Sequence, residues 1–289
     1  MENVLRFTRV SPWLMLLAGW VGMYLPVYWW ALQGIWQTDE QAHGLIVLIV
    51  SCGLLAMRRR ALLAAPLMPA PRVGWASFLL GLLIYFVGRI LDISILLMGS
   101  QIPVLLGATL LIGGWTAARA IWFPIFYLVF MIPLPGMVVD ALTVPLKQWV
   151  SVIAEHLLYL VGYPIARDGV MLTIGQYQLL VADACSGLHS MFSLSALGSV
   201  FIYITARASR LHNALMIASI LPIAFAANIV RVLVLVLVTY HLGDEAGQGF
   251  LHGAAGIVLM IVALLSLFGL DALLARLIRP RVTPRFASA

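Results

Sequence analysis

Long apolar segments separated by short polar stretches run along most of the chain. A helix rises about 1.5 Å per residue, so about 20 apolar residues cross the hydrocarbon core of a bilayer. Eight segments of roughly this length are present, at residues 11–32, 42–57, 73–91, 94–115, 120–138, 185–205, 212–240 and 252–274. The pattern predicts an all-α polytopic membrane protein with about eight transmembrane helices. We expect one integral-membrane domain over 1–289, with a short basic tail at 275–289.

The longest stretch between two spans, residues 133–184, predicts structure of its own. Prolines within 132–136 end the fifth helix, because proline cannot continue the helical hydrogen bonds. Polar residues then recur at steps of three and four, which mark one helical face. They are Asp140, Thr143, Lys147, Ser151 and Glu155. We interpret this helix as amphipathic and lying in the outer membrane interface; a ninth span is the alternative. Two β-prone runs, 169–174 and 177–181, surround a two-residue turn and predict a small β-hairpin before the sixth span.

Composition and charge agree with a membrane protein. The chain is 63% apolar and 10% charged, against about 45–50% and 25% in soluble domains, which excludes a soluble enzyme, a disordered protein and a disulfide scaffold. A net charge of +6 often indicates a nucleic-acid partner. Eight spans with both termini in the cytoplasm instead place 13 of the 17 basic residues on the cytoplasmic side and 9 of the 11 acids opposite. This sorting follows the positive-inside rule, so we expect no nucleic-acid partner.

Cys185 opens the sixth span on the outer side, where it is well placed for chemistry. Asp183 is the expected N-cap of this helix. A helix N-terminus stabilises negative charge, and so favours a reactive thiolate. The other cysteine, Cys52, lies within an apolar span near the opposite face, where a buried, inert thiol is the expected role. An intramolecular disulfide is therefore not expected.

Two further polar residues lie toward the outer ends of the next two spans. Arg231 is nine residues before the outer end of the seventh span, where a guanidinium costs several kcal/mol unless it faces protein or water. Asn228, three residues earlier on the same face, could orient it. His252 begins the eighth span. Together with Cys185 these residues suit acyl transfer. Cys185 attacks an amide carbonyl, Arg231 stabilises the thiolate or the oxyanion, and His252 acts as general acid and base.

Other assignments stay open at this point. His189, one helical turn after Cys185, is an alternative base, and His43, which heads the second span, is a possible member of the same cavity. Ser186 lacks the Gly-x-Ser-x-Gly context of a nucleophile elbow. No His-Glu-x-x-His, P-loop or Rossmann glycine motif occurs, so we expect neither a metal nor a cofactor. The alternative function is a transporter or lipid-binding protein in which Arg231 binds an anionic substrate.

Three short motifs on consecutive late spans resemble the exosortase/archaeosortase family. They are Ala184-Cys185-Ser186-Gly187-Leu188, Asn228-Ile-Val-Arg231 and His252-Gly-Ala-Ala-Gly256. The supporting matches are His43-Gly44, Ile132-Pro-Leu-Pro135, Tyr163-Pro164 and Asp168-Gly169, so that the resemblance covers roughly 20–275. It implies a membrane cysteine transpeptidase or protease with Cys185, Arg231 and His252 in the family's catalytic positions.

The resemblance also implies the partners and the location. The substrates are exported proteins with a C-terminal Pro-Glu-Pro signal, one transmembrane helix and a basic end. The implied location is the bacterial inner membrane, with the active site facing the periplasm. The acceptor is left open between water, a glycolipid or polysaccharide, and another amine.

Overall fold

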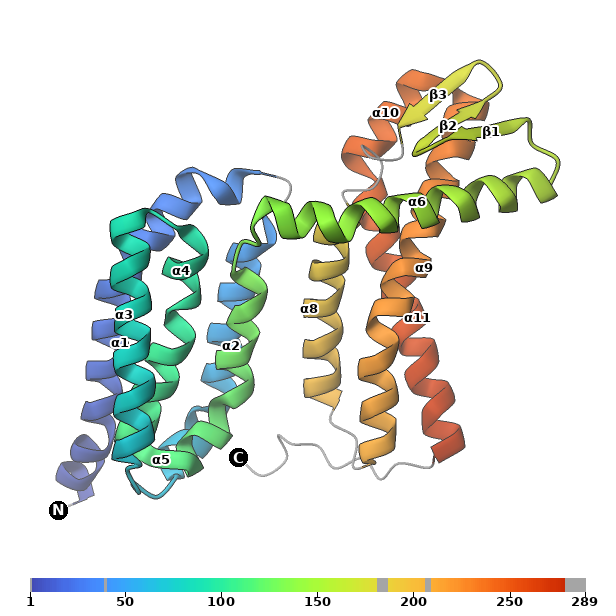
Figure 1. Cartoon of the computed structure of the whole chain (residues 1–289). Helices are drawn as coiled ribbons and strands as arrows, with labels where there is room; N and C mark the ends of the chain where they lie inside the picture. Colours follow the sequence, from blue (N-terminus) through green and yellow to red (C-terminus); the bar gives the residue numbers. More distant parts are fainter. Residues whose placement is uncertain (1, 39–40, 181–186, 206–208, 279–289) are drawn as a thin grey trace. The chain divides into compact units, whose positions relative to one another are not determined.

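The computed structural model describes residues 2–38, 41–180, 187–205 and 209–278, and of 2–10, 142, 187–191 and 250–253 it describes the backbone alone. The chain is mostly helical and divides into two compact units, unit 1 over 1–135 and unit 2 over 136–288. Unit 1 contains α1 Glu2–Gln33, the 3-10 turn η1 Ile35–Gln37, α2 His43–Ala64, α3 Pro71–Leu91, α4 Ser94–Gly99, α5 Gln101–Tyr127 and the 3-10 turn η2 Leu128–Met131. Unit 2 contains α6 Gly136–Leu160, β1 Ile165–Asp168, β2 Met171–Ile174, β3 Tyr177–Leu180, α8 Gly187–Thr205, α9 Arg210–Leu242, α10 Asp244–Gly253 and α11 Ala255–Ile278 (Figure 1).

Glycines allow α3 to pack closely against α4 and α5 in unit 1. A Cβ added to Gly81 would lie 2.7 Å from the backbone nitrogen of Val104, and one added to Gly88 would lie 2.9 Å from that of Leu97. Such contacts between backbones are typical of membrane helices, since lipid provides no hydrophobic force that drives helices together. Glycine therefore fixes this helix pair where soluble proteins would use large side chains.

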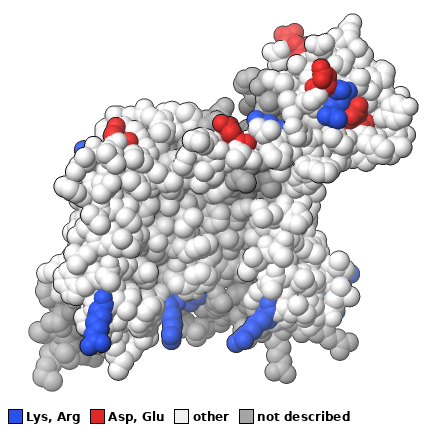
Figure 2. Space-filling model, in the orientation of Figure 1, with Lys and Arg blue, Asp and Glu red and all other residues white. Residues whose placement is uncertain are grey.

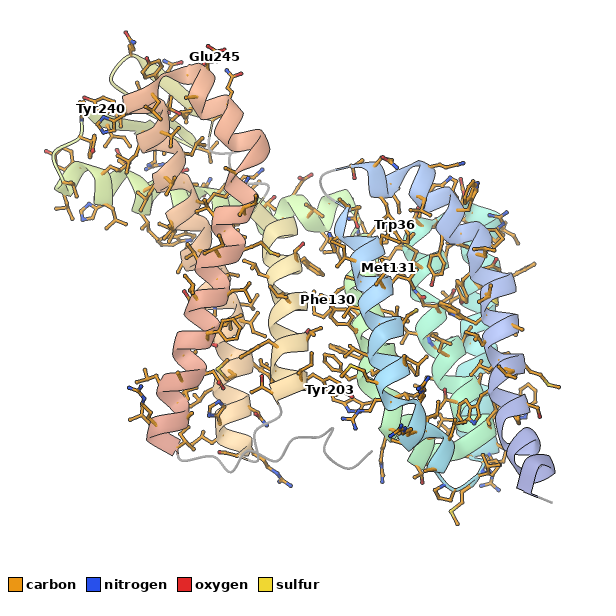
Figure 3. All side chains as sticks on the ribbon, turned by 180° about the vertical axis from the view of Figure 1, so that it is seen from behind. Trp36, Phe130, Met131, Tyr203, Tyr240 and Glu245 are labelled. Atoms are coloured by element: carbon orange, nitrogen blue, oxygen red, sulfur yellow. The ribbon has the colours of Figure 1, made fainter. Side chains whose placement is uncertain are left out.

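The helix α5 reverses direction at Gly114, so that it supplies two of the expected spans. Gly114 has φ +63 and ψ −158, and a Cβ added there would collide with the carbonyl oxygen of Met68. Both ends of α5 lie at one end of unit 1. At the start of α5, Gln101 accepts a hydrogen bond from Tyr28. Just beyond the end of α5, the carbonyl oxygen of Phe130 is 3.0 Å from Nε2 of His43. Trp36 and Met131 lie near this same end of unit 1 (Figure 3). The chain thus runs out and back within 101–131.

Unit 2 is built around α9, which has 33 residues. At about 1.5 Å per residue it is about 50 Å long, well beyond a hydrocarbon core of about 30 Å. The helices α8 and α11 pack along its first two thirds, and α10 folds back along its last third (Figure 1). The final part of α9 carries the small sheet, so unit 2 has a helical end and a sheet-bearing end.

The sheet has three antiparallel strands in the order β1-β2-β3, where the sequence predicted two. β2 and β3 pair with Ile174 opposite Tyr177. The first predicted run begins at Met171 rather than Gly169, because Gly169 has φ +60 and turns the chain after an additional strand, β1. Leu172 and Ile174 point into a core formed by α6, the sheet and α9, and both are fully buried.

Helix α6 lies across α8 and α9 at the level where the sheet begins (Figure 1). Its length and composition also make it a candidate span, but this crosswise course favours the interfacial interpretation over a ninth span. The interpretation of its faces was partly wrong. Thr143 and Ser151 of the polar face are buried, whereas Asp140 is exposed. Among the apolar residues of α6, Val150 is buried and Trp149 and Leu157 are exposed. The inward side of α6 is therefore mixed: it buries two small hydroxyls together with Val150, Ala154 and Leu158.

Six helices within the described residues are long and apolar enough to cross a membrane, as a polytopic membrane protein requires. They are Ser11–Gln33, Pro71–Leu91, Ser94–Met131, Gly136–Leu160, Arg210–Leu242 and Ala255–Ile278. The segment expected at 42–57 is helical but continues through three arginines to Ala64. The fifth expected span ends at Met131 instead of 138. The eighth begins at Ala255 instead of His252, because His252 belongs to α10.

Most charges are sorted by helix end within each unit, and basic side chains also occur among the acids at the sheet-bearing end (Figure 2), where Arg167 pairs with Glu155. In unit 1 the end formed by the α2–α3 turn and the Gly114 reversal carries Arg58, Arg59, Arg60, Arg72 and Arg119. We call it the basic end of unit 1. In unit 2, Arg210 and Arg276 lie at the helical end, and Asp244 and Glu245 lie at the sheet-bearing end.

We expect Gly114→Ala to destabilise the protein strongly. The backbone of Gly114 lies in a region that is accessible almost only to glycine, at a cost of about 1–3 kcal/mol for other residues, and the added methyl also meets Met68. Gly53→Ala is the matched control, because a Cβ at Gly53 meets nothing within 4 Å. Thermal unfolding in detergent should show a clear loss for the first variant and little change for the second. Equal stability of the two variants would refute the reversal.

Candidate active site

The structure describes the predicted site residues to different extents. Cys185 and Asp183 lie outside the described residues. His189 and His252 lie in the first turn of α8 and the last turn of α10, where the backbone alone is described. Arg231 and Asn228 are described in full.

Arg231 is buried in the middle of unit 2. Its side chain is 6% exposed and that of Asn228, three residues earlier, is 0% exposed. Neither residue is without an interaction partner. Their spacing places both on one face of α9, as the sequence predicted. Arg231 is eleven residues from the end of α9 at Leu242, so this charge lies deep within the protein and not at a helix end.

A buried cluster just below Arg231 aligns three helices. It joins Leu194 of α8 with Ala227 of α9 and Leu259 of α11. Distances from this cluster toward the sheet-bearing end follow from the helical rise. Arg231 is four residues after Ala227 on α9, which is about 6 Å. His189 is five residues before Leu194 on α8, which is about 7.5 Å. Gly187, where α8 begins, and His252 are each seven residues back, about 10 Å. Arg231, the start of α8 and the end of α10 therefore lie within about one helical turn of the same level.

The helix α10 brings His252 to this level. The sequence predicted a short loop after the seventh span, but α9 continues to Leu242, turns at Gly243 and is followed at once by α10. Gly247 and Thr239 are both four residues from Gly243, and a Cβ at Gly247 would lie 3.1 Å from that of Thr239. Because α10 descends antiparallel to α9, His252 returns toward Arg231 rather than staying in an outer loop.

Three other histidines are not brought to Arg231 within unit 2. His241 lies ten residues farther along α9, about 15 Å, beside Tyr240 at the sheet-bearing end (Figure 3). Its Nε2 is 3.1 Å from the hydroxyl of Tyr163. His212 lies at the other end of α9, and His156 is exposed on α6. His43 belongs to unit 1. His189 and His252 are thus the two histidines of unit 2 at the level of Arg231.

The sequence did not predict the burial of four polar residues, His212, Asp271, Thr143 and Ser151. His212, at the start of the predicted seventh span, is 1% exposed, and its Nε2 lies 2.8 Å from Oδ1 of Asp271 on α11. An acid within the apolar segment of α11, together with a histidine at the same end of α9, was the available signal. Thr143 and Ser151 of α6 face inward, and their hydroxyls donate to carbonyls of α6 itself. These hydroxyls are thus satisfied within α6, on the side where Val150 and Ala154 pack against α9.

Comparison with known protein families gives a match over most of the chain. Residues 35–269 match the model of the transmembrane exosortases (Exosortase_EpsH). The chain belongs to the transmembrane exosortase family. The resemblance found in the three short motifs is thereby confirmed, and the matched range includes Cys185, Arg231 and His252. No curated protein and no solved structure matches this exosortase.

We expect a pair of introduced cysteines to test the course of α10 in this exosortase. In a chain with Cys52 and Cys185 replaced by alanine, Thr239→Cys with Gly247→Cys should form a disulfide readily, because their Cβ atoms would be close to the separation of about 3.5–4.5 Å that a disulfide needs. Thr239→Cys with Gly249→Cys is the control, since a Cβ at Gly249 meets nothing within 4 Å. Cross-linking of both pairs to the same extent would contradict the described position of α10.

Proposed function

We propose that this exosortase is a cysteine transpeptidase or protease that cleaves the C-terminal sorting signal of exported proteins. The observation that carries the proposal is the buried guanidinium of Arg231 at the level where α8 begins and α10 ends. Cys185 is two residues before α8 in the sequence, and His252 is in the last turn of α10. A transporter has no need of a cysteine at that helix start.

The first half of the proposed reaction forms a thioacyl enzyme. The thiolate of Cys185 attacks the scissile carbonyl carbon, and a C–S bond forms as the carbonyl oxygen becomes an oxyanion. Arg231 donates hydrogen bonds to this charge, which are strong in a site that excludes water. The C–N bond then breaks as His252 gives a proton to the leaving amine. The signal, with its transmembrane helix, departs and the protein remains bound to Cys185.

The second half releases the protein to an acceptor. His252 removes a proton from the acceptor, which attacks the thioester carbonyl. The C–S bond then breaks, and Cys185 leaves as the thiolate beside protonated His252. Water gives hydrolysis, whereas a glycolipid, a polysaccharide or another amine gives transfer. Asn228 orients Arg231, and Asp183 caps the helix that follows it. His189 is the alternative to His252 as the base, and His43 is a supporting candidate from unit 1.

The proposed topology brings substrate and site together. Eight spans with both termini in the cytoplasm place the sheet-bearing end of unit 2 in the periplasm of a bacterium, above the inner membrane. Substrates are anchored by one transmembrane helix with a basic cytoplasmic end. This geometry holds their Pro-Glu-Pro signal at the outer membrane surface, where α6 lies in the interface. The distribution of charge by helix end supports this orientation.

We expect Cys185→Ala to abolish processing of a tagged protein that carries a Pro-Glu-Pro signal, because no other group replaces the nucleophile. Cys52→Ala is the matched control, since it removes the only other thiol of the chain and should leave processing unchanged. The measurement is the ratio of cleaved to uncleaved substrate in the same membranes. Normal cleavage by Cys185→Ala would overturn the proposal.

We expect Arg231→Gln to lower the rate of cleavage by about 10²–10³-fold, the usual effect of removing one oxyanion donor. Loss of the cation should also raise the pH at which Cys185 becomes alkylated, because less thiolate is present. Arg210→Gln removes the same charge from the opposite end of the same helix and is the matched control. A folded Arg231→Gln enzyme with the wild-type rate and alkylation profile would exclude this role.

A further inference from the structure

Unit 1 contains a cavity between α1, α2 and the two halves of α5. Its volume is about 670 Å³, within the range of about 300–1,000 Å³ that is typical of small-molecule sites. Most of its wall is aliphatic, including Leu16, Leu48, Leu63, Leu105, Ile125 and Leu128. Nothing in the proposed transpeptidase reaction uses this space.

Two polar groups in the wall lack partners within the part of the chain that the structure describes. The hydroxyl of Thr109 has no hydrogen bond, although this residue is 0% exposed. The indole Nε1 of Trp20 is likewise buried and without a partner. By contrast, Ser51 in the same wall donates to the carbonyl of Pro124 over 2.7 Å. An unsatisfied donor in apolar surroundings is costly, so Thr109 and Trp20 fit a ligand that carries acceptor atoms.

The cavity wall also includes a cation. Arg59 lines it, eight residues beyond Ser51 on α2 and at the basic end of unit 1. Thr109 lies five residues before the Gly114 reversal that forms this end, which corresponds to about 7.5 Å along the helix. The site thus has an apolar interior, hydrogen-bond donors within it and positive charge at one end. An amphiphile with an anionic head and an apolar tail matches all three features.

We propose that this cavity binds one acyl chain of an anionic glycerophospholipid, with its phosphate at Arg59 and an ester carbonyl at the hydroxyl of Thr109. Basic pockets between transmembrane helices on the cytoplasmic side are suited to such lipids. The site lies in unit 1, and the proposal is independent of the reaction proposed for unit 2.

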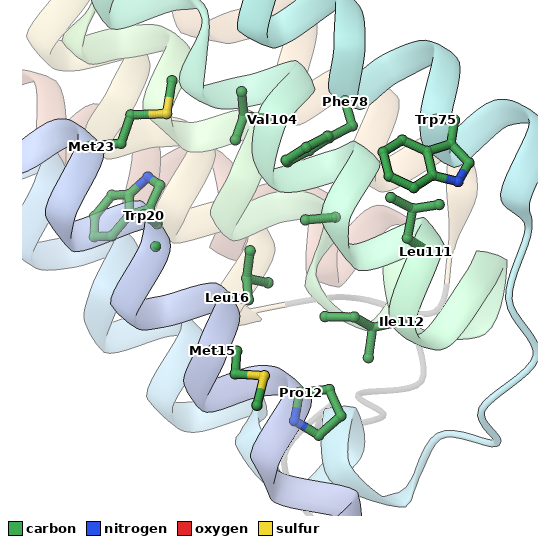
Figure 4. Close-up of a pocket in the computed structure, with 12 residues that line it drawn as sticks. Pro12, Met15, Leu16, Trp20, Met23, Trp75, Phe78, Val104, Leu111 and Ile112 are labelled. Atoms are coloured by element: carbon green, nitrogen blue, oxygen red, sulfur yellow. The ribbon is translucent and has the colours of Figure 1, made fainter.

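A second cavity, on another side of α1, provides an internal comparison. It has a volume of about 480 Å³ and shares Leu16 and Trp20 with the first (Figure 4). Its wall also includes Met15, Phe78 and Leu111, and none of the lining residues that the structure describes is charged. Without a cation it has no means of selecting an anionic head, so it should accept neutral and anionic lipids alike.

The test uses the full chain purified in detergent, with phosphatidylglycerol and phosphatidylcholine of identical acyl chains as probes. Native mass spectrometry should show about fivefold tighter binding of phosphatidylglycerol, the effect of one arginine near a lipid phosphate. Arg59→Gln should abolish this preference. Arg60→Gln, which removes the neighbouring charge outside the cavity wall, should retain it. Thr109→Val should weaken the binding of both lipids equally.

Cys52 reports on the location of the lipid. Contrary to the sequence-based expectation of a buried thiol, Cys52 is exposed and lines the first cavity. In a Cys185→Ala chain, phosphatidylglycerol should slow the alkylation of Cys52 by N-ethylmaleimide, and phosphatidylcholine should do so less. Equal binding of the two lipids, equal effects of Arg59→Gln and Arg60→Gln, or lipid binding without protection of Cys52 would each overturn the proposal.

Discussion

The buried charge of Arg231 is the constraint on which the arrangement of unit 2 depends. A guanidinium at the centre of a membrane helix costs about 2.5–3.5 kcal/mol on insertion scales, and more on an isolated helix. The helix α9 can carry it because other elements cover the surrounding level. The cluster with Leu194 and Ala227 lies on one side of Arg231 along α9, and the cluster with Val150, Val232 and Val236 lies on the other. The crosswise course of α6 and the return of α10 both follow from the need for protein around this residue.

Unit 1 is stabilised mainly by close contacts between helix backbones and has no comparable buried charge among its described residues. Its helices approach through glycines and are joined by hydrogen bonds between distant helices, such as Tyr24 of α1 with Ser100 at the start of α5, at 2.7 Å. Where two helices touch through their backbones on one face, their other faces are farther from the neighbouring helices. Side chains alone must fill the space between those faces. The two cavities beside α1 are the result. A bilayer supplies molecules that fit such spaces, so incomplete packing in unit 1 becomes a means of selecting lipid.

The helices were predictable from the sequence, because length and hydropathy are direct consequences of the bilayer. The details that failed are those in which tertiary packing decides. The burial of Thr143 and Ser151 depends on which side of α6 meets protein, and periodicity alone does not say. Strand β1 has few β-prone residues and forms because Gly169 turns it onto β2. The helix α10 has a polar sequence that resembles a loop, and only its packing on α9 reveals its position.

The sequence was enough to identify the candidate site residues, and the packing of the helices then showed which histidines lie near Arg231. The energetic cost of an arginine within an apolar span was enough to identify Arg231. Helix lengths then separated His241 and His212 from it, by about 15 and 28 Å along α9. For His212 the predicted span 212–240 already indicated this separation. The distinction between His241 and His252 was not predictable, because it depends on where α9 ends and α10 begins.

The central claim is that Cys185 carries the protein substrate as a thioester during sorting. The most direct measurement is mass spectrometry of this exosortase after brief incubation with a signal-bearing substrate and rapid acid quenching. The account predicts a peptide containing Cys185 whose mass is increased by the acyl portion of the substrate and which hydroxylamine releases. Cleavage that proceeds at the normal rate while Cys185 is quantitatively alkylated, or a covalent adduct on any other residue, would contradict it.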